Sequence, residues 1–290
     1  MQITTLIEDR PGPGALAHEF GLSLYIETGD TRILLDTGQT GAFADNARAL
    51  GIDLGLTDLA VISHGHFDHG GGLGRLLKDF PQIPVHLHKW AMGDFYANIG
   101  SKLSPGVSRL FPHWFKSLPP FRRYIGLPRE AVEAHAPKFK LVNRTWHFRD
   151  NISLVTHIPL PHPMPRGNDS LLARDQGKLI PDGFVHEIIL VLKEKDGLTL
   201  VTGCCHKGIL NIINAMSMYF PGIPIKAVVG GFHLKKQNDE EVEALARALA
   251  DTNIPRIITG HCTGDAAQAI LAQTLGDRLE ALVTGSIHDI

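Results

Sequence analysis

The chain has few of the features that would place it outside the cell or in a membrane. Three cysteines in 290 residues argue against a disulfide framework and favour a reducing compartment. The apolar runs, such as residues 188–192, fall well short of the about 20 residues that a membrane helix needs. Residues 1–8 lack the basic start and apolar core of a secretory signal. We therefore expect a cytoplasmic protein with no membrane partner.

An excess of charge of one sign is also absent. The sequence has 28 Lys and Arg against 30 Asp and Glu, with no basic stripe, so no nucleic-acid partner is expected. It contains neither a G-x-x-x-x-G-K-[ST] phosphate loop nor a strand-linked G-x-G-x-x-G motif. Hydrophobic residues make up 43% of the chain, which is ample for a large core. Composition leaves the oligomeric state open.

Short apolar runs alternate with helical periodicity, a pattern that predicts an α/β fold. The order of elements repeats from about residue 187, so we expect two similar halves within a single domain, 1–290. Two facing sheets with helices outside would bury this pattern. The expected strands are 22–27, 32–35, 59–62, 83–87, 152–155, 187–192, 198–201, 226–229 and 256–259, and the expected helices are 41–50, 72–77, 208–218, 240–250 and 265–275.

Residues 90–146 differ from the rest of the chain in composition, because aromatic, proline and arginine residues are interleaved there. This composition predicts an irregular or helical insertion. It could be a small satellite core, or a cap that walls off a site and excludes water. The residues concerned are Phe95, Tyr96, Phe111, Trp114, Phe115, Phe121, Arg122, Arg123, Tyr124 and Arg129.

Histidine is abundant, with 16 residues, and three of them crowd into the run His64-Gly65-His66-Phe67-Asp68-His69. The run follows the expected strand 59–62. Imidazole and carboxylate ligands suit zinc, iron or manganese. The spacing of His64 and His66 lets both rings reach one ion, while Asp68 and His69 can serve a second ion nearby.

The pattern H-x-H-x-D-H, with Leu34-Leu35-Asp36-Thr37-Gly38 upstream, resembles the metallo-β-lactamase superfamily. That resemblance implies an αββα sandwich, with the metals at one edge between the two sheets. Later runs narrow the resemblance to the branch that includes dihydropterin ribofuranosyl-aminobenzene 5′-phosphate synthases and many metal-dependent hydrolases. These runs are Gly203-Cys204-Cys205-His206, Gly230-Gly231-Phe232-His233 and Gly260-His261-Cys262.

The resemblance carries over to most of the ligand positions. His64, His66, Asp68 and His69 match the first motif and His261 the last ligand, while Cys204 falls where the superfamily has a bridging aspartate. Cys204 is either a ligand thiolate or a packed apolar residue. The Gly-His-Thr histidine expected between about residues 155 and 182 is missing, although His157 and His162 lie there. We infer that His206 supplies that imidazole.

Other residues receive supporting roles. The resemblance implies that Asp36 organises the site's hydrogen bonds and is not a ligand. We expect His233 to bind substrate or transfer protons, and Asp68 to be catalytic as well as a ligand. The remaining candidates, Cys205, Cys262, His86, His88, His186 and Glu187, are interpreted as structural.

These assignments predict an enzyme with two divalent transition-metal ions, with zinc favoured over iron or manganese. It would use a metal-bound hydroxide or a metal-held phosphate on a phosphate-bearing or other anionic small molecule, which includes the synthase-type reaction of the branch. Lys207, Arg122, Arg123 and His233 would bind the substrate. Alternatives are a lactone, thioester or phosphodiester hydrolase, a di-iron redox protein and a non-catalytic metal-binding module.

Overall fold

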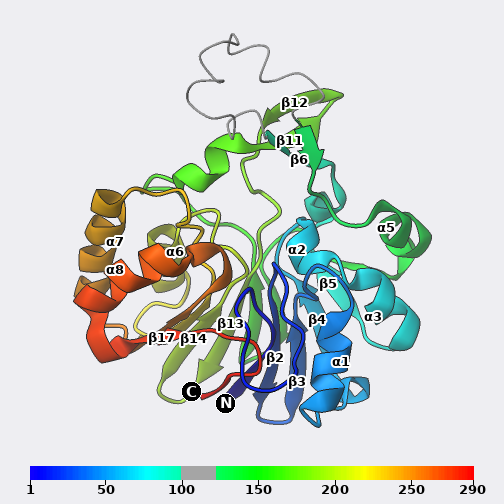
Figure 1. The fold of residues 1–290 in the computed structure, drawn as a ribbon, viewed down its shortest axis with the longest axis horizontal. Helices are drawn as coiled ribbons and strands as arrows, with labels where there is room; N and C mark the ends of the chain where they lie inside the picture. The colour runs from blue at the N-terminus through cyan, green and yellow to red at the C-terminus, as the bar shows by residue number, and fades with distance from the viewer. Residues whose placement is uncertain (99–121) are drawn as a thin grey trace.

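The computed structural model describes residues 1–98 and 122–290. Two seven-stranded sheets lie face to face, and helices cover the outer side of each (Figure 1). This four-layer arrangement is the αββα sandwich that the sequence predicts. No helix within the described ranges is long and apolar enough to cross a membrane.

The two sheets share one plan, in which antiparallel strands give way to parallel ones. The first has the order β18-β1-β2-β3-β4-β5-β8, with parallel pairing from β3 onward. The second has the order β17-β16-β15-β14-β13-β10-β9, with parallel pairing from β14 to β17. The first sheet's strands are β1 (Gln2–Ile7), β2 (Ser23–Thr28), β3 (Thr31–Leu35), β4 (Leu59–Ile62), β5 (Val85–Leu87), β8 (Lys140–Leu141) and β18 (Ile287–Asp289). Those of the second are β9 (Trp146–Arg149), β10 (Ile152–Val155), β13 (Ile189–Glu194), β14 (Gly197–Val201), β15 (Ile225–Gly230), β16 (Arg256–Thr259) and β17 (Leu279–Ala281).

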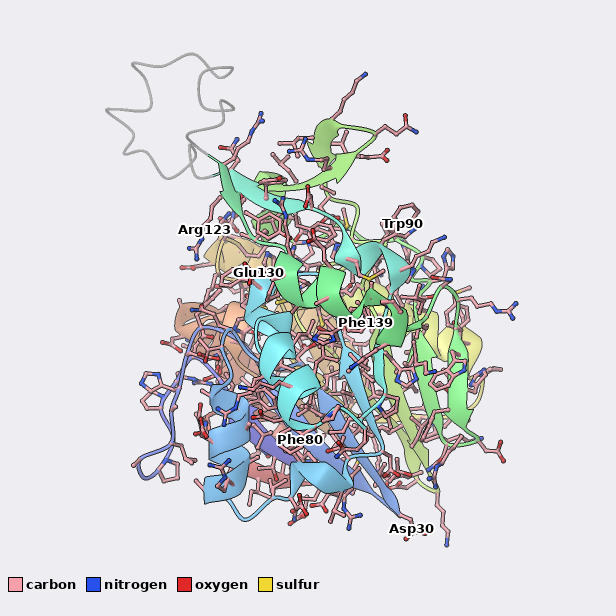
Figure 2. The ribbon with its side chains drawn as sticks, turned by 90° about the vertical axis from the view of Figure 1, so that its right-hand side faces the viewer. Asp30, Phe80, Trp90, Arg123, Glu130 and Phe139 are labelled. Carbon is pink, nitrogen blue, oxygen red and sulfur yellow. The ribbon has the colours of Figure 1, made fainter. Side chains whose placement is uncertain are left out.

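Helices flank the two sheets separately. On the first sheet lie α1 (Ala42–Ala49), α2 (Phe67–Gly70), α3 (Leu73–Asp79) and α5 (Arg129–His135), with α5 packed against α3 (Figure 2). On the second lie α6 (Ile209–Tyr219), α7 (Asp239–Asp251) and α8 (Asp265–Leu275). The five helices expected from periodicity are all present.

Alternation along the strands explains the layers. In β3, Ile33 and Leu35 point into the core between the sheets, whereas Leu34 points outward to the core under α1 and α3. Successive side chains of a strand face opposite sides. Because both faces are buried, these strands read as continuous apolar runs in the sequence.

The parallel pairing brings the functional loops to one edge. Leu35 pairs with Val61, so β3 and β4 end side by side before Asp36 and His64. In the second sheet Val201 pairs with Val229, and Gly230 pairs with Thr259. The loops that follow β14, β15 and β16 therefore start at the same level.

A smaller four-stranded sheet lies over that edge, at the top of Figure 1. Its order is β12-β11-β6-β7, formed by β6 (Phe95–Asn98), β7 (Arg122–Tyr124), β11 (Leu171–Asp175) and β12 (Lys178–Pro181). Residues 90–146 thus supply two of its strands, where irregular or helical structure was expected. β6 pairs with β7 and also with β11, whose residues lie 74 to 78 positions further along the chain, so no local sequence pattern indicates the second pairing. The expected aromatic residues Phe111, Trp114, Phe115 and Phe121 lie outside the described residues.

Candidate metal centre

Three imidazoles converge where β4 and β14 end. His64 Nε2 lies 3.1 Å from His66 Nδ1 and 3.2 Å from His206 Nε2. All three side chains are buried, with 5% exposure at most. We call these residues the first ligand group.

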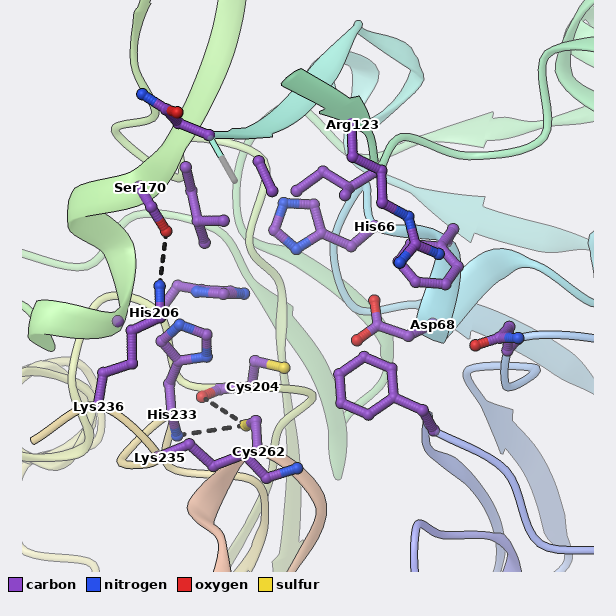
Figure 3. Close-up of a pocket in the computed structure, with 18 residues that line it drawn as sticks. His66, Asp68, Arg123, Ser170, Cys204, His206, His233, Lys235, Lys236 and Cys262 are labelled. Carbon is purple, nitrogen blue, oxygen red and sulfur yellow. Dashed lines mark hydrogen bonds between the residues drawn. The ribbon is translucent and has the colours of Figure 1, made fainter. Parts of the chain in front are cut away.

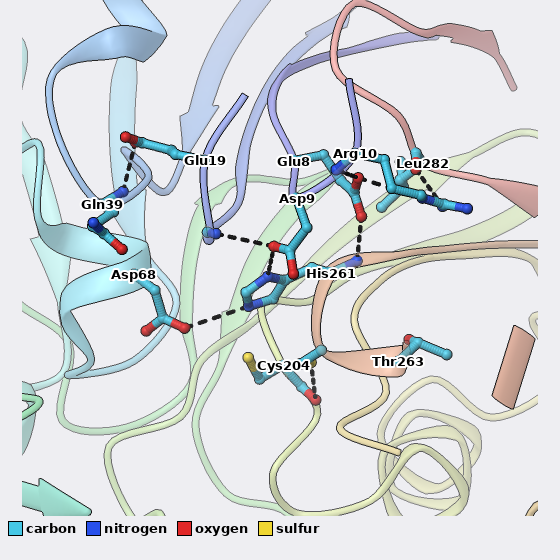
Figure 4. Close-up of polar contacts among 12 residues, drawn as sticks. Glu8, Asp9, Arg10, Glu19, Gln39, Asp68, Cys204, His261, Thr263 and Leu282 are labelled. Atoms are coloured by element: carbon cyan, nitrogen blue, oxygen red, sulfur yellow. Dashed lines mark hydrogen bonds and ion pairs between the residues drawn. The ribbon is translucent and has the colours of Figure 1, made fainter. Parts of the chain in front are cut away.

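A second ligand group lies beside it and consists of Asp68, His69, Cys204 and His261. His69 Nε2 is 3.0 Å from Cys204 Sγ and 3.2 Å from His261 Nε2. Asp68 Oδ2 lies 3.5 Å from His261 Nε2 (Figure 4). Because the donor atoms of His64, His69 and Cys204 also lie within 4.8 Å of one another, Cys204 stands between the two groups.

Four of these imidazoles are held through the nitrogen that faces away from the centre. Each outer Nδ1 lies 2.6–2.9 Å from an oxygen atom that accepts its proton, an arrangement that orients metal-binding histidines. Asp36, which accepts from His69, also accepts from Ser63 N and Oγ, as a residue that organises the site should. The pairs are His64–Ser63, His69–Asp36, His206–Asn168 and His261–Asp9.

This hydrogen bonding leaves lone pairs pointing at one another. When Ser63 and Asn168 hold the Nδ1 protons of His64 and His206, both Nε2 atoms of these neutral rings carry lone pairs, and they are 3.2 Å apart. A cation between them relieves that repulsion. Nitrogen, sulfur and carboxylate donors suit a divalent transition metal, so the residues present fit such ions.

Burial favours the neutral imidazoles that metals bind. It lowers the pKa of His66 to about 3, and those of His64 and His206 well below their ordinary value. Burial also raises the pKa of the Cys204 thiol. For Asp68, burial acts upward on the pKa, but hydrogen bonding to His261 and the neighbouring histidines outweighs it, and the pKa falls well below its usual range. Burial acts downward on the pKa of His261, but hydrogen bonds to Asp68 and Asp9 outweigh it and raise that pKa well above its ordinary value. The centre therefore offers the anionic carboxylate of Asp68 beside neutral nitrogen donors at His64, His66 and His206.

Strained backbone accompanies the centre. Asp36, Cys205, His233 and His261 have φ angles of 61°, 55°, 54° and 49°, in the left-handed region that side chains rarely adopt. Such conformations cost energy and cluster at functional sites. Here they turn the chain sharply after β3, β14, β15 and β16.

A cavity of about 470 Å³ opens onto the two groups (Figure 3). Its lining includes the metal-facing residues His66, Asp68, Cys204 and His206. Arg123 lies 5.1 Å over the ring of Phe67, and Lys235 Nζ lies 5.0 Å over the ring of Phe20. Lys236 also lines the cavity. The mouth thus combines aromatic rings with positive charge.

The structure brings most of the predicted site residues together, but not all of them. His233 lines the cavity, with its ring 4.2 Å from that of His206. Arg122 and Lys207 are absent from the cavity lining, although both were expected to bind substrate. Lys207 is only 6% exposed and packs behind the centre, where its backbone N–H donates to Glu187. Arg123 lines the cavity, as do Lys235 and Lys236, two cations that the sequence analysis did not single out.

The histidine positions agree with the inference about His206. His157 and His162 are exposed, and neither lines the cavity at the centre. His206 occupies the place beside His64 and His66. The motif Gly203-Cys204-Cys205-His206 at a strand end was the signal that identified it.

Several supporting residues gave no sequence signal. Asp9 and Asn168 hold imidazoles from segments far from any histidine motif. His186 and Glu187 were interpreted as structural, yet His186 Nδ1 accepts from Gly65 N, and Glu187 accepts from His206 N at 2.6 Å. These contacts join segments more than 15 residues apart, so a local motif could not reveal them.

Comparison with known proteins agrees with this geometry. The family model of the metallo-beta-lactamase superfamily matches residues 18–165. The chain is 28% identical, over 99% of its length and 96% of the relative, to 7,8-dihydropterin-6-methyl-4-(beta-D-ribofuranosyl)-aminobenzene-5′-phosphate synthase of Methanocaldococcus jannaschii.

Solved structures give the same assignment. The crystal structure of Tm1679, a metal-dependent hydrolase of the beta-lactamase superfamily, matches with a TM-score of 0.81 and 30% identity, covering 100% of this chain and 99% of that one. Zn²⁺-bound PqqB from Methylobacterium extorquens shares the fold at 11% identity and a TM-score of 0.55, with both chains fully covered. The ligand loops, the sandwich that presents them and these similarities lead to one conclusion: the chain belongs to the metallo-beta-lactamase superfamily.

Proposed function

We propose that the protein is an enzyme that uses two divalent transition-metal ions to act on an anionic, phosphate-bearing small molecule. The observation that carries this proposal is the pair of facing Nε2 lone pairs on His64 and His206 in the first ligand group, which a bound cation reconciles with the outer hydrogen bonds of both rings. The first group, His64, His66 and His206, would hold one ion. Asp68, His69 and His261 would hold the other, with Cys204 between them.

Bound at these groups, the ions would supply Lewis acidity and positive charge for a reaction at an electrophilic carbon or phosphorus centre. Zinc suits the donor set best, with iron and manganese as alternatives. The chain's own residues supply the rest of the chemistry. His233 lines the cavity, and its Nδ1 is buried and has no hydrogen-bond partner within the described part of the chain, so we assign proton transfer to this ring.

The cavity mouth supports the substrate class. Arg123 and Lys236 supply positive charge for a phosphate, beside Lys235, whose Nζ pairs with Asp9 at 2.7 Å. Phe20 and Phe67 offer an apolar wall for a ring system. The similar synthase from M. jannaschii is named for a dihydropterin, an aminobenzene ring and a 5′-phosphate. We therefore favour a synthase-type reaction on such a molecule.

A hydrolase is the second candidate. The specific observation in its favour is the 30% identical structure described as a metal-dependent hydrolase. Lactones, thioesters and phosphodiesters are the substrates to screen. The products separate the two functions, because a synthase-type reaction joins two substrate molecules, whereas hydrolysis consumes water and yields a new carboxylate or phosphomonoester.

Metal content tests the proposal. We expect about two transition-metal ions per chain in protein purified without chelator, as the donor set requires. His66→Ala and His206→Ala should each lose at least one ion together with activity on any substrate that the wild type converts. His162→Ala, at an exposed position, is the matched control and should keep both. If His206→Ala kept both ions and only His162→Ala lost one, the assignment of His206 as a metal ligand would be wrong.

A further inference from the structure

A short segment before β13, residues 182–187, supports the first ligand group from the side away from the cavity. Phe184 is fully buried and stacks on His206, with ring centroids 4.0 Å apart and planes 8° from parallel. Glu187 accepts from the backbone N–H groups of His206 and Lys207. None of the six residues lines the cavity at the centre, so the segment acts on the metal ligands and not on a substrate.

Asp182 and His186 complete the support in a fixed proton order. Gly65 N–H can only donate, so His186 Nδ1, at 3.0 Å, must accept. The proton of neutral His186 therefore sits on Nε2 and is donated to Asp182 Oδ2 at 3.1 Å. The other carboxylate oxygen accepts from Phe184 N at 2.8 Å. Asp182 is thus held on both oxygens in one orientation.

In this orientation the carboxylate of Asp182 points toward the ring of His66. The Nε2 of His66 lies 4.0 Å from Asp182 Oδ2 and is a buried nitrogen with no hydrogen-bond partner among residues 1–98 and 122–290. The other ring nitrogen, Nδ1, is the one that faces His64. A carboxylate next to Nε2 favours the tautomer with its proton there, which leaves the Nδ1 lone pair for a metal ion.

His66, Asp182 and His186 could also be taken as a third metal site, since their donor atoms lie within 4.8 Å of one another. The proton order argues against it, because a protonated Nε2 on His186 has no lone pair to give. The chemistry of the cluster is hydrogen bonding to one ligand.

We propose that residues 182–187 form a positioning segment that sets the metal affinity of the first ligand group independently of the second. Asp182 does so by fixing the proton of His66 on Nε2, and Phe184 and Glu187 by fixing His206. The second group has different outer partners, Asp9 on His261 and Asp36 on His69. This inference rests on the proposed two-ion centre.

Two matched substitutions test it. Asp182→Asn removes the carboxylate behind His66, and Asp9→Asn removes the one behind His261. Binding of Zn²⁺ and Co²⁺ to the metal-free full-length chain, measured by chelator competition, should resolve two steps in the wild type. We expect Asp182→Asn to weaken one step by about tenfold or more and Asp9→Asn to weaken the other step.

A spectroscopic measurement separates positioning from general damage to the fold. In the zinc-loaded protein, the Nε2 proton of His66 should give a slowly exchanging imidazole N–H signal. Exchange of that proton with solvent should become faster in Asp182→Asn, which lacks the carboxylate next to it, and should stay slow in Asp9→Asn. If Asp182→Asn does not fold, His186→Gln tests the same link, because it disturbs the donor that orients Asp182.

The outcomes are distinct. Two unchanged binding steps in folded Asp182→Asn would overturn the inference, and so would equal weakening of both steps. A wild-type chain that binds fewer than two ions would overturn the proposed function instead. In that case, weaker binding of the remaining ion in Asp182→Asn would still support the inference, whereas unchanged binding of that ion would overturn the inference as well.

Discussion

At the scale of single residues, two neighbours in the short turn η7 (Arg166–Ser170) decide where two imidazoles lie. Asn168 accepts from His206 Nδ1 and donates to the His206 carbonyl oxygen. Gly167 lies so close to His233 that a Cβ there would be 2.4 Å from the ring's Cδ2. Asn168 thus holds the ring of His206 by hydrogen bonds, and Gly167, which has no side chain, leaves room for the ring of His233.

Gly167→Ala should therefore displace His233 without touching a metal ligand. We expect kcat to fall at least tenfold, as loss of a proton-transfer group does, and the free energy of unfolding to fall by about 1–3 kcal/mol through overpacking. Kinetics, metal analysis and urea denaturation check this. Gly74→Ala is the control, because a Cβ there makes only ordinary contact, and it should leave kcat unchanged. An unaltered kcat in Gly167→Ala would remove His233 from the proposed chemistry.

The two arginines at the cavity mouth differ in position, which gives a second residue-scale prediction. Only Arg123 lines the cavity. Arg123→Ala should raise the KM for an anionic substrate about tenfold, the effect of losing a charge-assisted contact of roughly 1.5–3 kcal/mol, with metal content intact. Arg122→Ala, next to it in β7, should not change KM. If Arg123→Ala had the same KM as Arg122→Ala and the wild type, β7 would serve packing and not substrate binding.

At the scale of elements, α7 begins with a reciprocal cap that also borders the site's supporting turn. Asn238 Oδ1 accepts from Glu241 N at 2.9 Å, and Glu241 Oε2 accepts from Asn238 N at 3.1 Å. Glu241 also pairs with Arg166 of η7 at 2.6 Å. The start of α7 is thus joined to the turn that carries Gly167 and Asn168.

Asn238→Ala should lower the free energy of unfolding by about 1 kcal/mol, the usual value of an N-cap side chain. The effect should remain local, so metal content is expected to be normal. Urea denaturation followed by circular dichroism measures the loss. A variant as stable as the wild type would mean that water replaces the cap without cost.

The elements and the ligand residues differ in how well the sequence predicts them. Strands such as β4 and β16 are short apolar runs, and the ligands that follow them are adjacent in sequence, so local patterns were enough. The pairing of β6 with β11 and the hydrogen bonds of Asp9 and Asn168 join remote segments. Such contacts depend on tertiary packing, which no local period encodes.

At the scale of the whole molecule, each ligand group draws on both halves of the sandwich. The first group combines His64 and His66, after β4, with His206, after β14. The second combines Asp68 and His69 with Cys204 and His261. A bound ion therefore cross-links the two sheets.

Removal of the metal should destabilise the whole fold, because an ion that binds only the folded state stabilises it by about 2.7 kcal/mol at a concentration of 100 Kd. We expect a chelator to lower the Tm by several degrees, and added zinc to restore it. Calorimetry of the wild type with and without chelator measures this shift. His66→Ala should show a smaller shift, and a Tm indifferent to chelator in the wild type would contradict the cross-link.

The hydrogen bonds around Asp36 have a consequence for folding fidelity. Asp36 N donates to Val61 O, and Asp36 accepts from Ser63 N, across the pairing of Leu35 with Val61. A slip of one residue between β3 and β4 would turn every side chain to the opposite face and would carry Asp36 away from His69. A mispaired chain would thus bind metal ions poorly. Ion binding would therefore stabilise only those molecules in which β3 and β4 are paired in the correct register, and would select against misfolded ones.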